Sequence, residues 1–105
     1  MPRYITLGSY TIEGTAALVD GDSDRRAVME VMHKSVGATL VDYCITRGQY
    51  DFYVISDADS FEQIAAMTLK AKGSGTVDNP VILEAVDIDE IRSVAKSIQF
   101  TPPSG

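Results

Sequence analysis

Four segments of the chain are rich in β-branched and aromatic residues, and the segments between them carry apolar residues at helical spacing. The first pattern predicts strands at residues 4–11, 39–46, 51–56 and 81–86. The second pattern predicts a helix that starts at residues 22–24 and ends at Gly37, a helix that starts at residues 57–60 and ends at Gly73, and a shorter helix from Asp87 to Ile98. Residues 15–21 fit either a helical turn or an irregular loop.

Short polar residues mark where these elements begin and end. Side chains that accept a hydrogen bond are favoured at the first residue of a helix, and Asn-Pro pairs favour a turn. The boundary residues are the N-cap candidates Asp22, Ser23 and Asp24, the capping-box pairs Asp59 with Glu62 and Asp87 with Glu90, and the turn pair Asn79-Pro80. Together they give the order strand, helix, strand, strand, helix, strand and a terminal helix.

This order is typical of an α+β chain with the ferredoxin-like βαββαβ topology. Each crossover is long enough for a helix and is expected to be right-handed. The sequence therefore predicts a four-stranded antiparallel sheet with both main helices on one face, followed by a C-terminal helix.

Both faces of the predicted sheet are apolar. Ile5 and Leu7 alternate with Tyr4 and Tyr10, and the later strands likewise place apolar residues on both faces. In residues 39–46, strict alternation puts Tyr43 and Ile45 opposite Leu40 and Cys44. Two helices cover only one face, and monomers rarely expose a large apolar patch. We expect the second face to pack against another copy through a two-fold axis; in the alternative, the terminal helix folds over it.

Composition narrows the class of protein. The 105 residues predict one domain at residues 1–100 and a flexible tail at residues 101–105. A net charge of −6 argues against a nucleic-acid partner and against an anionic membrane surface. The single cysteine excludes an internal disulfide, one cysteine with one histidine is too few ligands for a zinc site, and no cofactor is expected. A chain without a long apolar run or disulfides fits the cytoplasm.

Tyr50 and Asp51 are the first candidates for chemistry. They follow Gly48 in the predicted hairpin, where a phenol and a carboxylate could bind a small ligand or transfer a proton. A structural role also fits the pattern, because glycine adopts a positive φ in turns and aspartate accepts backbone N–H bonds there. The sequence favours the structural role for both.

Other candidates lie on the strands and on the first helix. His33 could be a general base or a ligand of haem or a metal, although a surface or half-buried helix position is the simpler interpretation. Tyr10 and Tyr53 could line a pocket or pack at an interface. Cys44 lies within a strand and is expected to act as a small buried hydrophobe.

The segment from Arg3 to Thr11, the pair Glu13-Gly14 and the motif Gly48-Gln49-Tyr50-Asp51 together resemble the GYD domain family. These small bacterial proteins are named for the glycine, tyrosine and aspartate of the motif. The resemblance covers about residues 3–98. It implies a dimeric α+β barrel, in which two ferredoxin-like sheets pair face to face, and implies no particular activity.

Three functions remain open from the sequence. The first is a homo-oligomeric module that binds a small molecule or regulates another process. The second is a cofactor-independent enzyme, similar to monooxygenases and isomerases of related barrels, that acts on a small organic substrate between sheet and helices. The third is a structural subunit with a filled interior. The candidate ligand-binding residues are Tyr10, His33, Tyr50, Asp51 and Tyr53.

Overall fold

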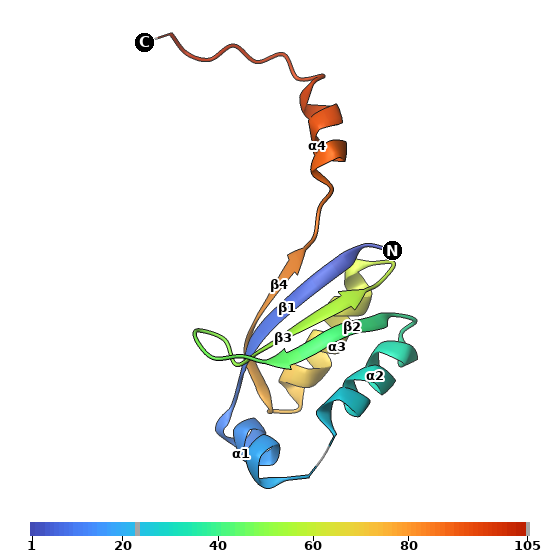
Figure 1. Ribbon diagram of the computed structural model, residues 1–105, viewed down its shortest axis with the longest axis vertical. Coiled ribbons are helices and arrows are strands. Elements are labelled where there is room, and N and C mark those ends of the chain that lie inside the picture. Colours follow the sequence, from blue (N-terminus) through green and yellow to red (C-terminus); the bar gives the residue numbers. More distant parts are fainter. Residues whose placement is uncertain (23, 105) are drawn as a thin grey trace.

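A computed structural model describes residues 1–22 and 24–104. Its elements are β1 (Arg3–Tyr10), α1 (Ile12–Asp20), α2 (Arg25–Ser35), β2 (Thr39–Ile45), β3 (Phe52–Asp57), α3 (Phe61–Gly73), β4 (Val77–Glu84) and α4 (Ile88–Ala95) (Figure 1). All strand pairs are antiparallel, in the order β2-β3-β1-β4. The predicted ferredoxin-like α+β fold is confirmed.

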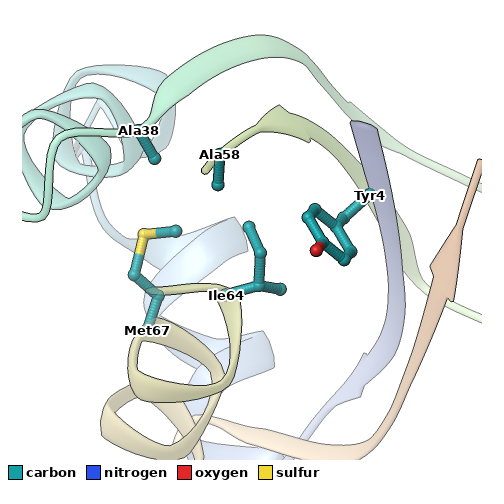
Figure 2. Packing of buried hydrophobic residues seen from close by; sticks show 5 residues of the cluster. All are labelled: Tyr4, Ala38, Ala58, Ile64 and Met67. Atoms are coloured by element: carbon teal, nitrogen blue, oxygen red, sulfur yellow. The ribbon is translucent and has the colours of Figure 1, made fainter. Parts of the chain in front are cut away.

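Helices α2 and α3 cover one face of the sheet (Figure 1). Every second side chain of β3 points to this face, and these residues, Phe52, Val54 and Ser56, are buried. The core cluster shown in Figure 2 joins β1 and α3 with Ala38, just before β2, and Ala58, just after β3, and the Tyr4 ring points toward the fully buried Ile64. Burial of these apolar groups determines which face of the sheet packs against the helices.

The opposite face, called the open face below, is not covered by any described element. Strand register places five apolar side chains on it, together with Tyr53. They are Ile5, Leu7, Ile55, Val81 and Leu83. All are only partly buried or exposed in the single chain.

Helix α4 does not fold over the open face, so the alternative in which the terminal helix covers it is wrong. The helix projects away from the domain at the end of β4 (Figure 1), and every residue of α4 is exposed. The radius of gyration is 17.7 Å, against about 13 Å for a compact chain of 100 residues. The difference arises because residues 85–104 extend beyond the globular part.

Local differences from the sequence-based elements have simple physical reasons. Residues 12–20 form a helix, because the Thr11 hydroxyl accepts the Gly14 N–H at 3.1 Å and caps it. The first main helix is capped by Asp24, whose carboxylate accepts the Ala27 N–H at 3.1 Å; the candidate Ser23 lies outside the described residues. The Gly37 end of that helix is confirmed, with φ +77°.

The later boundaries also differ in detail. Helix α3 is capped by Ser60, whose backbone N–H donates to the Gln63 side chain at 2.9 Å, so the predicted Asp59–Glu62 box is displaced by one residue. Asp87 caps α4 through the Asp89 N–H at 2.9 Å, without a return bond from Glu90 among the described residues.

The last strand begins before the predicted turn. Strand β4 starts at Val77 and ends at Glu84, so Asn79-Pro80 lies inside it. This strand is at the sheet edge and is irregular opposite Leu7–Ser9. An edge strand tolerates proline because the missing N–H faces away from the neighbouring strand.

Candidate functional site

A cavity of about 230 Å³ lies between the helix-facing side of the sheet and helices α2 and α3. Most of its wall is apolar. The apolar wall includes Val28, Met29, Met32, Val54, Ile64 and Met67. Pockets for drug-sized ligands measure roughly 300–1,000 Å³, so this cavity suits a smaller molecule.

His33 lies deep in this wall and is only 2% exposed, so the expectation of a surface or half-buried position is wrong. Its Nδ1 lies 2.7 Å from the Met29 carbonyl oxygen, and its Nε2 lies 2.7 Å from the Ser56 hydroxyl. A carbonyl only accepts, so Nδ1 carries the proton and, in the neutral ring, Nε2 accepts from Ser56. Burial lowers the pKa of His33, although the Met29 carbonyl opposes this.

We expect the free energy of unfolding to fall as the pH is lowered from about 7.5 through 6.5. The unfolded histidine has a pKa of about 6.5. Because the pKa of folded His33 is lower, the unfolded state binds more protons in this range, and stability is lost until the pH reaches the folded pKa. Denaturant unfolding at pH 7.5 and pH 5.5 measures this loss.

The matched variant for this test is His33→Gln, which removes the titrating group. It should show a flatter stability profile between pH 5.5 and 7.5 than the unaltered protein. The pKa values of Asp42 and Asp57 are lowered by their hydrogen-bond partners, so these carboxyls change protonation only below the pH range of this test. A profile equally flat in both proteins would contradict a buried, neutral His33.

Tyr10 and Tyr43 meet in the same cavity. Their hydroxyl oxygens lie 2.5 Å apart, and the Tyr10 ring packs on Phe52 with centroids 5.0 Å apart. Burial, and then the bond to Tyr43, raise the pKa of Tyr10 well above its ordinary value. The Arg25 guanidinium lies 5.9 Å from the centroid of the Tyr10 ring, within range of a cation–π contact.

Tyr43 and Arg25 were not among the sequence candidates. Strict alternation separates Tyr43 from Leu40, but the register shifts between Leu40 and Asp42, so both residues pair with helix-facing positions of β3. A bulge of this kind adds one residue and turns the following side chains to the other face. The position of Arg25 at the start of a predicted helix was visible in the sequence, but the sequence does not show what that helix end faces.

Tyr50 and Asp51 lie at the hairpin and do not line the cavity. The Asp51 carboxylate accepts the Tyr10 N–H at 2.9 Å, and the Asp51 N–H donates to the Gly8 carbonyl at 2.8 Å. The Tyr50 carbonyl accepts the Thr46 hydroxyl at 2.5 Å. The two bonds of Asp51 tie the loop to the end of β1, the strand that places Tyr10 in the cavity.

Tyr53 lies on the open face, on the opposite side of the sheet from Tyr10 and His33. Its hydroxyl donates to the Asp42 carboxylate at 2.8 Å, and this bond, followed by burial and the charge of Asp42, raises the pKa of Tyr53 to about 12. Cys44 is paired with Tyr53 across β2 and β3 and is exposed, so the expectation that it is buried is wrong. Of the five candidates, the structure brings together Tyr10 and His33.

Within residues 1–22 and 24–104, there is no group of three or more His, Cys, Asp or Glu side chains placed to hold a metal ion. No helix in the same part of the chain is long and apolar enough to cross a membrane.

Comparisons with known proteins agree with this architecture. A solved structure described as "crystal structure of FFRP-DM1" superposes with a TM-score of 0.52 and 16% identity, over 82% of this chain and 100% of that one. This is a likeness of fold. A protein of Thermus thermophilus named "Glutamine synthetase and cystathionine beta-lyase binding protein" is 25% identical over 91 residues, which are 87% of this chain and 95% of the relative.

The family comparison covers most of the chain. The model of the GYD domain matches residues 4–95, from the first strand to the end of α4. The matched range contains the hairpin motif Gly48-Gln49-Tyr50-Asp51 and the Glu13-Gly14 pair. The chain belongs to the GYD domain family.

Proposed function

We propose that this protein is a small regulatory binding module that takes a small molecule in the cavity and does not transform it. The observation that supports this most is the state of the polar groups in the cavity. Both nitrogens of His33 are held by Met29 and Ser56, and the hydroxyls of Tyr10 and Tyr43 are held by each other. Apolar walls with a few fixed polar groups suit selective binding.

A cofactor-independent enzyme is the weaker alternative. It requires an acid or base that reaches a substrate in the cavity. His33 alone of His33, Tyr50 and Asp51 lines the cavity, and its ring is already engaged on both sides.

A thermal-shift screen of small metabolites tests the proposed function. Selective binding to the folded state raises the midpoint of unfolding in a concentration-dependent way. Ala71→Leu fills the cavity and should remove the shift, whereas Ala66→Leu on the exposed side of the same helix should keep it. Mass spectrometry of each hit after incubation should recover it unchanged, and consumption of the compound would favour the enzyme.

We also propose that the module is a homodimer formed through the open face. The support is the apolar surface that no part of the described chain covers. Two copies related by a two-fold axis would bury it in the manner of a dimeric α+β barrel. The single cysteine agrees with a reducing compartment such as the cytoplasm.

Light scattering at micromolar concentration should give twice the mass of the chain. Ile5 lies between Ile55 and Leu83 near the middle of the open face, so Ile5→Lys should yield a monomer, because a two-fold interface would bury two unpaired charges. Leu69→Lys, at a 67% exposed position of α3, is the matched control and should remain a dimer. A monomeric mass for the unaltered protein would overturn the proposal.

A protein partner is the second candidate, and the name of the Thermus thermophilus relative favours it. In this chain, the exposed residues Ile88, Ile91, Val94 and Ile98 give α4 and the turn after it an apolar stripe. Such a stripe suits docking into a groove of another protein. Regulation would then follow if the ligand in the cavity changed this docking.

A further inference from the structure

We propose that the ligand of the cavity is a small organic anion, a carboxylate on an apolar body, with Arg25 as its counter-ion. This inference rests on the proposed binding function and adds the chemical class of the ligand. Three observations support it: the charges around the cavity, the environment of the Arg25 Nε atom, and the direction in which α2 runs along the wall.

The charged side chains that line the cavity are all cations. Arg25 and Lys70 are part of the wall, and no aspartate or glutamate of residues 1–22 and 24–104 lines it. The whole chain has the opposite balance, with 15 acidic and 9 basic residues. A cavity with two cations inside an acidic protein attracts anions and disfavours cationic ligands.

Arg25 has an unused hydrogen-bond donor. Its Nε is buried and has no partner among the described residues, while its guanidinium lies over the Tyr10 ring. A buried donor without an acceptor is costly. The hydroxyls of Tyr10 and Tyr43 bond to each other, and neither accepts a hydrogen bond from this atom. A carboxylate matches the planar fork of a guanidinium better than a neutral group does.

The two cations lie at one end of the cavity. Arg25 is the first residue of α2, and Lys70 is in the last turn of α3. Figure 1 shows that these two helix ends lie on the same side, next to α1 and the start of β4. The positive end of the α2 dipole points in this direction and adds to the attraction for an anion.

The rest of the cavity fits an apolar body. Arg25, Met29 and His33 follow one another at intervals of four residues, so they line the wall along one face of α2. At 1.5 Å per residue, the backbone positions of Arg25 and His33 are about 12 Å apart. A ligand with its carboxylate at Arg25 would place its body against Met29 and direct its far end toward the neutral His33–Ser56 pair.

Isothermal titration in a phosphate-free buffer tests this assignment. The probes are 3-phenylpropionate and hexanoate, each compared with its uncharged amide. We expect each acid to bind at least about tenfold more tightly than its amide, because a charge-assisted bond to Arg25 is lost in the amide. Arg25→Gln should remove most of that preference.

Arg26→Gln is the matched control, because Arg26 is the adjacent residue and carries the same charge. It does not line the cavity; its guanidinium pairs with Asp42 and the Tyr43 carbonyl. It should keep the preference for acids. Lys70→Gln, on a different helix, provides a second test should Arg25→Gln fail to fold, as judged by circular dichroism, and should weaken the preference.

Each other outcome overturns the assignment. Equal binding of acids and amides would leave the cavity as a binding site but refute an anionic ligand. Acid binding that persists in both Arg25→Gln and Lys70→Gln would place the anion elsewhere. No binding of any probe would refute the anion class, and the proposed binding function would fall with it only if the metabolite screen were also empty.

Discussion

We expect Ile64→Ala to lower the free energy of unfolding by about 3 kcal/mol, within the range of 2–5 kcal/mol for truncation of a buried isoleucine. Ile64 is 1% exposed and lies in the cluster of Tyr4, Ala58 and Met67, between α3 and the sheet (Figure 2). Removal of three methyl or methylene groups leaves a void that the surrounding side chains fill only in part. The same residue lines the cavity, so the void would join it.

Urea or guanidinium denaturation followed by circular dichroism measures this loss. Leu69→Ala is the control, because Leu69 has a similar volume, lies on the same helix and is 67% exposed. It should change the free energy of unfolding by less than about 1 kcal/mol. If both variants lost the same amount, Ile64 would not lie in the core of the protein in solution.

The second large effect is expected for Gly14→Ala, which should lower the free energy of unfolding by about 1–3 kcal/mol. A Cβ atom at Gly14 would stand 2.1 Å from the Thr76 carbonyl oxygen, which is far inside contact distance. That oxygen also accepts the Thr11 N–H at 3.1 Å, so the bond joining the start of α1 to the start of β4 would be strained or broken. The close approach of α1 explains why the Glu13-Gly14 pair needs a glycine.

Gly73→Ala is the matched control for that substitution. Gly73 is also helical, at the end of α3, and a Cβ there would meet nothing within 4 Å. Because alanine has the better helix propensity, this variant should be neutral or more stable by up to about 1 kcal/mol. Thermal or denaturant unfolding of both variants gives the comparison. Equal stability of Gly14→Ala and the unaltered protein would rule out this contact.

Much of the fold could be predicted because its signals are local. Segments rich in β-branched and aromatic residues identified the strands, and the order of elements allowed few topologies. The errors lie where tertiary contacts override local preference. Residues 15–21 gave an ambiguous pattern because α1 packs mainly through the small Gly14. Asn79-Pro80 lies inside a strand because the residues on either side of it, Asp78 and Val81, pair with β1.

The candidate site was predicted in part, for a different reason. Tyr10 and His33 were found because their residue types stand out on a strand and on a helix. Tyr43 was missed because a bulge in β2 reverses its side, and a bulge leaves no mark in the apolar pattern. Tyr50 and Asp51 do not line the cavity. Asp51 contributes only indirectly, because its carboxylate accepts the backbone N–H of Tyr10.

The sequence by itself determined the four strands, the main helices, their order and the membership in the GYD domain family, because these depend on residue periodicity and on short motifs. Only the tertiary structure decided that His33 is buried with both nitrogens bonded, that Arg25 has a buried donor beside Tyr10, and that α4 leaves the open face bare. The physical reason is that burial and hydrogen-bond partners are set by residues far apart in the chain, and no periodicity within one segment encodes what faces it across the core.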